Sequence, residues 1–113
     1  MKILYLEDEK HWRMRIKEVL EERGHMVVAV ATIEEALRDI THMRFDRIIC
    51  DGTILPGEID NGIEFAQQLI SQRIQAKVVV FTADTRRIPS GVPYVEKNAP
   101  GTTAEKVRQL LAR

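Results

Sequence analysis

The sequence predicts an α/β domain built on a parallel sheet, and three observations support this prediction. Short apolar runs alternate with segments of helical periodicity, which is the pattern of repeated βαβ units. The apolar runs are continuous, as expected for strands that helices cover on both faces. The 113 residues suffice for one hydrophobic core, and no repeat, linker-like tract or low-complexity segment divides them. We therefore expect one domain over residues 1–113, with no attached output domain.

Five short runs rich in branched apolar residues are the predicted strands. The run VVVF shows the pattern most clearly, and the last run, YV, is the shortest. In chain order, the predicted strands are residues 3–6, 26–31, 48–50, 78–81 and 94–95.

Four segments that carry apolar residues at helical spacing, with charges between them, are the predicted helices. Gly24 offers a stop for the first helix. The second and the fourth begin at capping boxes, Thr32 with Glu35 and Thr102 with Glu105. The apolar residues at helical spacing are Trp12, Ile16, Val19 and Leu20 in residues 10–23, Ala36, Leu37 and Ile40 after Thr32, Ile63, Phe65, Ala66, Leu69 and Ile70 in residues 62–72, and Val107, Leu110 and Leu111 after Thr102.

Two connections depart from this regular alternation. Residues 82–93 read TADTRRIPSGVP, in which two prolines and a glycine leave no apolar helical face. A parallel crossover normally contains a helix, so we expect this one to be reduced to a loop or a single turn. Residues 52–61, GTILPGEIDN, form an unusually long loop with several turn residues.

Charge and hydropathy exclude several classes of protein. The chain has 17 basic and 17 acidic residues, so no net field draws it to nucleic acid or to an anionic membrane. No apolar stretch approaches the roughly 20 residues of a membrane span, and the N-terminus reads as a strand rather than a signal peptide. We expect a soluble, cytoplasmic protein with no nucleic-acid or membrane partner. Its single cysteine, Cys50, lies in an apolar run and is interpreted as a buried structural thiol.

Chemically distinct polar residues follow the predicted strands. Glu7 and Asp8 follow the first strand, and Asp51 follows the third. The carboxyl ends of parallel strands meet at the edge where α/β folds bind ligands. Two carboxylates about 4 Å apart repel by roughly 4 kcal/mol at an effective dielectric near 20. A cation must therefore lie among them, and oxygen-only ligands suit Mg²⁺ or Mn²⁺.

A hydroxyl and an ammonium complete this group of strand-end residues. Thr82 follows the fourth strand and Lys97 follows the fifth. A metal, a lysine and a hydroxyl around one carboxylate are what phosphoryl transfer requires, because its transition state spreads negative charge over three oxygens. We interpret Asp51 as the acceptor, which would form an acyl phosphate.

The whole chain resembles a response-regulator receiver domain of two-component signalling, through KILYLEDE, IICD, VVVFTAD and YVEK. The resemblance implies a flavodoxin-like, doubly wound sheet of five parallel strands in the order 2-1-3-4-5, with the fourth helix shortened or missing here. It implies Mg²⁺ bound by Glu7, Asp8, Asp51 and the backbone carbonyl of Thr53, phosphorylation of Asp51, phosphoryl contacts from Thr82 and Lys97, a switch role for Tyr94, and modulation by Ala83 and Asp84.

The resemblance also implies partners and exposes departures from the family pattern. A histidine kinase or a phosphotransfer protein is expected to donate the phosphoryl group, and an unidentified downstream protein to respond. Asn98 stands where a proline commonly follows the lysine, so we expect a trans Lys97–Asn98 bond, because a cis bond without proline costs about 3–4 kcal/mol. Tyr94 has ordinary packing as its alternative role. We expect Lys97→Ala to leave the fold intact and to uncouple phosphorylation from the response.

Two other functions stay open on the sequence alone. One is a receiver-like interaction module that binds its partner independently of phosphorylation, which the altered loops favour. The other is a small phosphate-ester hydrolase with Asp51 as its nucleophile, although the short chain leaves little room for a substrate lid. We expect no turnover of a free substrate, only self-phosphorylation and autodephosphorylation with Mg²⁺. Metal binding should be visible in the fluorescence of Trp12, which lies close to the acidic pair in sequence.

Overall fold

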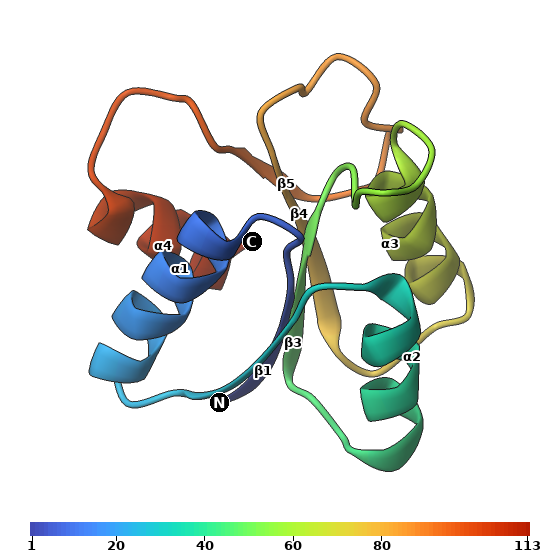
Figure 1. Ribbon diagram of the computed structural model, residues 1–113, viewed down its shortest axis with the longest axis horizontal. Coiled ribbons are helices and arrows are strands. Elements are labelled where there is room, and N and C mark those ends of the chain that lie inside the picture. The colour runs from blue at the N-terminus through green and yellow to red at the C-terminus, as the bar shows by residue number, and fades with distance from the viewer.

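Five parallel strands form a single sheet, as predicted (Figure 1). The computed structural model describes all residues 1–113. The strands are β1 (Lys2–Leu6), β2 (Met26–Val30), β3 (Arg47–Asp51), β4 (Lys77–Thr82) and β5 (Tyr94–Glu96). Their spatial order is β2-β1-β3-β4-β5, which confirms the predicted order.

Four helices cover the two faces of the sheet (Figure 1). They are α1 (Lys10–Glu22), α2 (Ile33–His42), α3 (Asn61–Ser71) and α4 (Thr103–Ala112). Helices α1 and α4 lie on one face, and α2 and α3 lie on the other. None of the helices is long and apolar enough to cross a membrane.

The connection between β4 and β5 contains no helix, as predicted, so the last helix of the chain is α4. Residues 83–93 form turns and irregular backbone instead. Val92 is buried and Ile88 is partly buried, and both pack against the core layer that lies under α2 and α3. Two apolar side chains of the loop therefore cover part of the sheet face that a crossover helix would cover.

The predicted caps are present at both capping boxes. The Thr32 hydroxyl accepts a hydrogen bond from the Glu35 N–H at 3.1 Å, and Thr102 accepts one from Glu105 at 3.1 Å. Gly24 follows α1 with a φ of +87°, a conformation that favours glycine. These local signals fix three helix ends close to the predicted positions.

Cys50 and the Lys97–Asn98 bond also match their predictions. Cys50 is fully buried in β3, and burial raises the pKa of its thiol to about 12. A thiol that stays protonated is a poor nucleophile, so Cys50 is a structural residue. The Lys97–Asn98 bond is trans. The one cis peptide bond of the chain joins Leu55 and Pro56.

Arg47 holds the end of α4 against the start of β3, a contact that the sequence did not reveal. Its guanidinium donates to the carbonyls of Leu110 at 3.0 Å, Leu111 at 2.9 Å and Arg113 at 3.3 Å. These carbonyls lie at the helix C-terminus, which lacks intrahelical donors and carries partial negative charge. Arg47 is almost fully buried, and this burial lowers its pKa. Arg47 therefore links the C-terminal end of α4 to the first residue of β3.

Replacing Arg47 with methionine is expected to lower the free energy of unfolding by about 2–3 kcal/mol, because charged hydrogen bonds to the helix end are lost. Urea denaturation measures this loss. The matched control is Arg44→Met, which changes an exposed arginine nearby and should alter stability by less than about 0.5 kcal/mol. Equal effects of the two substitutions would contradict the capping role.

Candidate functional site

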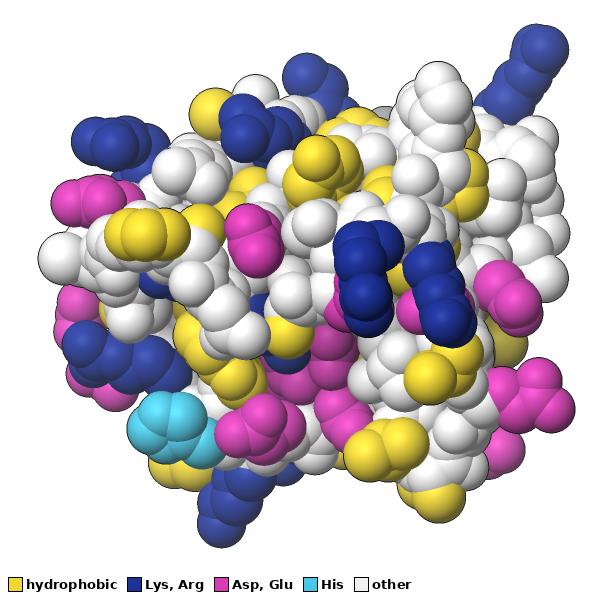
Figure 2. All heavy atoms as spheres, turned by 90° about the horizontal axis from the view of Figure 1, so that it is seen from above, with side chains coloured by type: hydrophobic (Ala, Val, Ile, Leu, Met, Phe, Trp, Pro, Cys, Tyr) yellow, Lys and Arg dark blue, Asp and Glu magenta, His cyan; other side chains and the backbone are white.

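A hollow lined with acidic side chains lies on the face where the strands end (Figure 2). It corresponds to an open pocket of about 620 Å³. Segments far apart in sequence meet there, as the strand ends predicted. Of the predicted site residues, the pocket is lined by Asp8, Asp51, Thr53, Thr82, Ala83, Asp84 and Lys97.

The three predicted carboxylates converge at this pocket, which Asp8 and Asp51 line while Glu7 is fully buried beside them. Glu7, Asp8 and Asp51 each offer an oxygen, and these three oxygens lie within 4.8 Å of one another. Burial raises the pKa of Asp51 to about 8; the nearby Glu7 carboxylate adds to the rise, while Lys97 opposes it. The cluster is therefore short of positive charge. Hard oxygen donors at this separation fit Mg²⁺ or Mn²⁺.

Because a metal needs the ionised Asp51 carboxylate, the affinity of the site for Mg²⁺ should rise with pH up to about 8.

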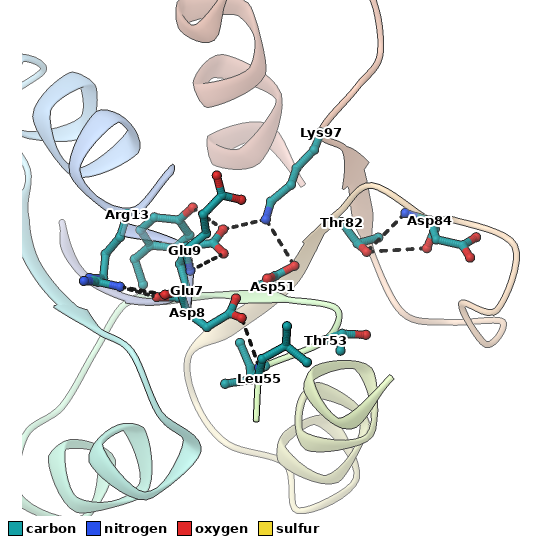
Figure 3. Close-up of polar contacts among 12 residues, drawn as sticks. Glu7, Asp8, Glu9, Arg13, Asp51, Thr53, Leu55, Thr82, Asp84 and Lys97 are labelled. Carbon is teal, nitrogen blue, oxygen red and sulfur yellow. Dashed lines mark hydrogen bonds and ion pairs between the residues drawn. The ribbon is translucent and has the colours of Figure 1, made fainter. Parts of the chain in front are cut away.

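Asp8 is oriented by the loop that follows β3. Its Oδ2 accepts a hydrogen bond from the Leu55 N–H at 3.0 Å (Figure 3). Burial acts to raise the pKa of Asp8, but this backbone donor and the contacts with Asp51 and Glu7 bring it below the usual value. Asp8 is thus an ionised carboxylate at the side of the pocket.

Glu7 is fully buried, and protein donors surround its carboxylate. Its Oε1 accepts a hydrogen bond from the Tyr5 hydroxyl at 2.9 Å and lies 2.6 Å from Lys97 Nζ. Its Oε2 accepts a bond from the Glu9 N–H at 3.3 Å. Burial, and then the charge of Glu7, raise the pKa of Tyr5 well above its ordinary value, so its hydroxyl remains a donor. Glu7 therefore anchors the lysine, in addition to belonging to the acidic cluster.

Lys97 points from the end of β5 toward the carboxylates (Figure 3). Its Nζ lies 3.2 Å from Asp51 Oδ1, and its side chain is only 6% exposed. The ammonium also lies 5.4 Å from the ring centroids of Trp12 and Phe81, within the range of a cation–π interaction. Two anions and two aromatic rings hold Lys97 beside the predicted acceptor.

Thr82 is turned toward Asp84 rather than toward Asp51 (Figure 3). Its hydroxyl accepts a long hydrogen bond of 3.4 Å from the Asp84 N–H. A Cβ atom at Gly52 would lie 2.4 Å from Thr82 Oγ1, so the residue after Asp51 must be glycine for Thr82 to hold this position. The hydroxyl is weakly held, which leaves it free to change partners.

The long loop between β3 and α3 folds around Asn61. The Asn61 side-chain amide accepts a bond from the Ile54 N–H at 2.6 Å and donates to the Ile54 carbonyl at 2.9 Å. The N-terminus of α3 also packs closely on β3, because a Cβ at Gly62 would lie 1.8 Å from the Asp51 carbonyl oxygen. These contacts fix the loop that carries Thr53.

Thr53 is linked to the β4–β5 loop on the far side of the pocket. Its hydroxyl accepts a bond from the Asp60 N–H at 2.9 Å, and the Asp60 carboxylate pairs with Arg87 at 3.3 Å. Asp84 pairs instead with Arg86 at 2.9 Å, and these contacts hold the pKa of Asp84 far below its usual range. The ion pair between Asp60 and Arg87 thus joins the two loops.

Tyr94 lies outside the pocket. It is 44% exposed on β5, the edge strand, where it pairs with Val80 of β4. The structure places it on the strand next to Thr82 but does not bring its side chain to the carboxylates. Its predicted switch role therefore stays a prediction.

Sequence reasoning missed Tyr5, Phe81 and Gly52 as parts of the site. Tyr5 and Phe81 were read only as apolar strand residues. The available signal was side-chain alternation, which places Tyr5 and Glu7 on the same face of one strand. The role of Gly52 depends on contact between β3 and β4, which no local pattern reveals.

The comparisons with known proteins agree with this geometry. A family model described as the response regulator receiver domain matches residues 3–101. The chain belongs to this family. As a response regulator receiver domain, it is a signalling module of a two-component system, in a family that binds Mg²⁺ at an acidic pocket.

One similar protein is the two-component response regulator PhoP of Pseudomonas aeruginosa. It is 35% identical to this receiver domain over 83 residues, which cover 74% of this chain and 36% of that protein. The chain thus matches about a third of the length of this curated relative. Function beyond the receiver domain does not follow from this similarity.

Solved receiver structures match nearly the whole chain. The response regulator TrrA of Thermotoga maritima, solved in complex with Mg²⁺ and BeF, is 29% identical with a TM-score of 0.76, over 96% of this chain and 97% of that one. The chemotaxis response regulator CheY4 of Vibrio cholerae is 26% identical with a TM-score of 0.78, over 99% and 96%. The Francisella response regulator 1452 receiver domain is 24% identical with a TM-score of 0.79, over 98% and 93%, and shows the fold alone.

Proposed function

We propose that this receiver domain accepts a phosphoryl group on Asp51 in a reaction that requires Mg²⁺. The donor is the phosphohistidine of a histidine kinase or of a phosphotransfer protein. The observation that carries the proposal is the position of Asp51, in an open pocket, 3.2 Å from Lys97 Nζ and within 4.8 Å of two other carboxylates. This is a charge arrangement suited to phosphoryl transfer.

The chemistry follows from the residues around Asp51. A carboxylate oxygen of Asp51 attacks the phosphorus, the phosphorus–nitrogen bond of the donor breaks, and the electron pair returns to the imidazole. Asp8, Asp51, the Thr53 carbonyl and Glu7 would hold the metal. When bound, Mg²⁺ neutralises charge on the phosphoryl oxygens. Lys97 supplies a second positive charge to the same oxygens.

The response begins at Thr82. Its hydroxyl gives up the long bond of 3.5 Å that it donates to the Asp84 carbonyl, and donates a stronger bond to a charged phosphoryl oxygen. The β4–β5 loop follows because it begins at Ala83, and Tyr94 at its other end changes its surroundings. Ala83 and Asp84 line the pocket and so modulate how long the acyl phosphate survives.

An unidentified downstream protein reads the changed loop, and the domain acts in the cytoplasm with its kinase. It neither binds nucleic acid directly nor docks on a membrane. It does not turn over a free substrate, because its product is its own Asp51 in phosphorylated form, which then hydrolyses.

Incubation with acetyl phosphate and Mg²⁺ is expected to add one phosphoryl group to the intact protein, because a small donor can reach the open pocket. Intact mass spectrometry measures the addition, and an excess of chelator should prevent it. An unchanged mass with Mg²⁺ present would contradict phosphoacceptance.

A phosphorylation-independent interaction module is the alternative, and the helix-free β4–β5 connection favours it because it alters the response surface. Such a module needs no working metal site. The single tryptophan, Trp12, lines the pocket together with Asp8 and Asp51 and therefore reports on metal there.

Titration with Mg²⁺ is expected to change Trp12 fluorescence saturably in the wild type and much less in Asp8→Asn, because a metal carboxylate is lost. Glu18→Gln is the control, since it removes an exposed acid of α1 outside the pocket. A flat titration of the wild type would favour the interaction module instead.

A further inference from the structure

Tyr5 and Lys97 share one oxygen of Glu7. The Tyr5 hydroxyl donates to Glu7 Oε1 over 2.9 Å, and Lys97 Nζ lies 2.6 Å from the same atom. Tyr5 and Glu7 are both fully buried. Tyr5 is the last residue but one of β1 and Glu7 directly follows the strand, so the two side chains, two residues apart in extended backbone, project to the same side. Tyr5 is thus a polar group placed inside an apolar core layer, with the site carboxylate as its hydrogen-bond partner.

Lys97 divides its charge between two carboxylates. Its Nζ is closer to Glu7, at 2.6 Å, than to Asp51, at 3.2 Å. A phosphoryl group on Asp51 brings additional negative oxygens within reach of the ammonium. Trp12 and Phe81, whose ring centroids lie 5.4 Å from Nζ, limit the other positions that the ammonium can take. The available movement of Lys97 is therefore from Glu7 toward Asp51.

This movement takes the cation away from a fully buried carboxylate. A buried carboxylate without a cation is strongly destabilised unless hydrogen-bond donors remain. Glu7 has two such donors, the Tyr5 hydroxyl on Oε1 and the Glu9 N–H on Oε2 at 3.3 Å. Only the Tyr5 hydroxyl binds the oxygen that Lys97 leaves.

We propose that Tyr5 is a positioning residue that holds Glu7 while Lys97 moves to the phosphoryl group. This inference rests on the function proposed above. Tyr5 donates its hydrogen bond to Glu7 and none to Asp51, and it acts through Glu7 and Lys97. Its hydroxyl therefore stabilises the phosphorylated state more than the unphosphorylated state, in which Lys97 still neutralises Glu7.

Tyr5→Phe tests the proposal, because it removes one oxygen and leaves the aromatic ring in the core. The probe is beryllofluoride, which mimics a phosphoryl group on a carboxylate, added at saturating Mg²⁺ and followed by calorimetry. The dissociation constant of beryllofluoride is expected to rise about tenfold in Tyr5→Phe, while that of Mg²⁺ alone changes less than about twofold. A purely structural role of Tyr5 would weaken neither.

Two further variants separate this role from a general loss of stability. Ile48→Val trims a fully buried side chain in the other core layer and should leave beryllofluoride affinity unchanged. In a Glu7→Gln background, Tyr5→Phe should cause almost no additional loss, because no buried charge then needs the hydroxyl.

The outcomes distinguish the two levels of the account. If the wild type and Tyr5→Phe bind beryllofluoride with equal affinity, only the role of Tyr5 is overturned. Equal weakening of Mg²⁺ and of beryllofluoride assigns Tyr5 to the metal site and also overturns it. If the wild type binds no beryllofluoride in the presence of Mg²⁺, the proposed function is overturned, and so is the role of Tyr5.

Discussion

Asp51→Asn is expected to abolish phosphorylation by acetyl phosphate and by protein donors. An amide oxygen is a far weaker nucleophile than a carboxylate. Asp51 Oδ1 lies 3.2 Å from Lys97 Nζ, and no other acidic residue that lines the pocket pairs with this lysine. The loss should exceed about a hundredfold in rate, the scale on which removal of a catalytic group acts. Measurement of incorporated phosphate over time checks it, and phosphorylation of the variant at the wild-type rate would contradict the assignment.

The same variant is expected to be more stable than the wild type without Mg²⁺, by about 1–2 kcal/mol. The pKa of Asp51 is raised from 3.8 to about 8 by burial, so folding favours its protonated form. The unfolded chain releases this proton near its ordinary pKa, and the folded protein keeps it up to about 8. The wild type should therefore lose stability relative to Asp51→Asn as pH rises between these values. Urea denaturation of both proteins across that range measures the difference, which should stay constant if the pKa of Asp51 is not raised.

Lys97→Ala is expected to lower the free energy of unfolding by about 3 kcal/mol at neutral pH, because the fully buried Glu7 carboxylate loses its cation. The sequence alone suggested that the fold would tolerate this change. Burial of Lys97 between Glu7 and Asp51 alters that expectation. Mg²⁺ should restore part of the lost stability, since it returns positive charge to the same cluster.

Lys77→Ala is the matched control for this prediction. Lys77 is exposed at the opposite end of β4, and its removal should change stability by less than about 1 kcal/mol. Urea denaturation with and without Mg²⁺ measures both variants. A loss for Lys97→Ala no larger than that for Lys77→Ala would show that the buried lysine does not stabilise the cluster.

Much of the site follows from the sequence because parallel strands end at one edge of the sheet. The apolar runs placed Asp51, Thr82 and Lys97 at strand ends, and strand order alone then brings them together. The missing helix between β4 and β5 was predictable for a similar reason, since proline and glycine act locally.

Other features depend on contacts between elements and leave no local pattern. Arg47 caps α4 only because the start of β3 and the end of the chain meet in the fold. The Leu55 N–H reaches Asp8 only because the long β3–α3 loop bends over the pocket. Tyr5 looked like an ordinary strand residue because its hydroxyl meets a carboxylate only once Glu7 is buried.

The most direct test of the account is to locate the phosphoryl group within the chain. Borohydride reduces an acyl phosphate to an alcohol, which converts a phosphorylated aspartate into homoserine. After treatment with acetyl phosphate and Mg²⁺, reduction and proteolysis, mass spectrometry is expected to find homoserine at position 51. Homoserine at another aspartate, or its absence from protein that carries phosphate, would contradict the identification of Asp51 as the acceptor.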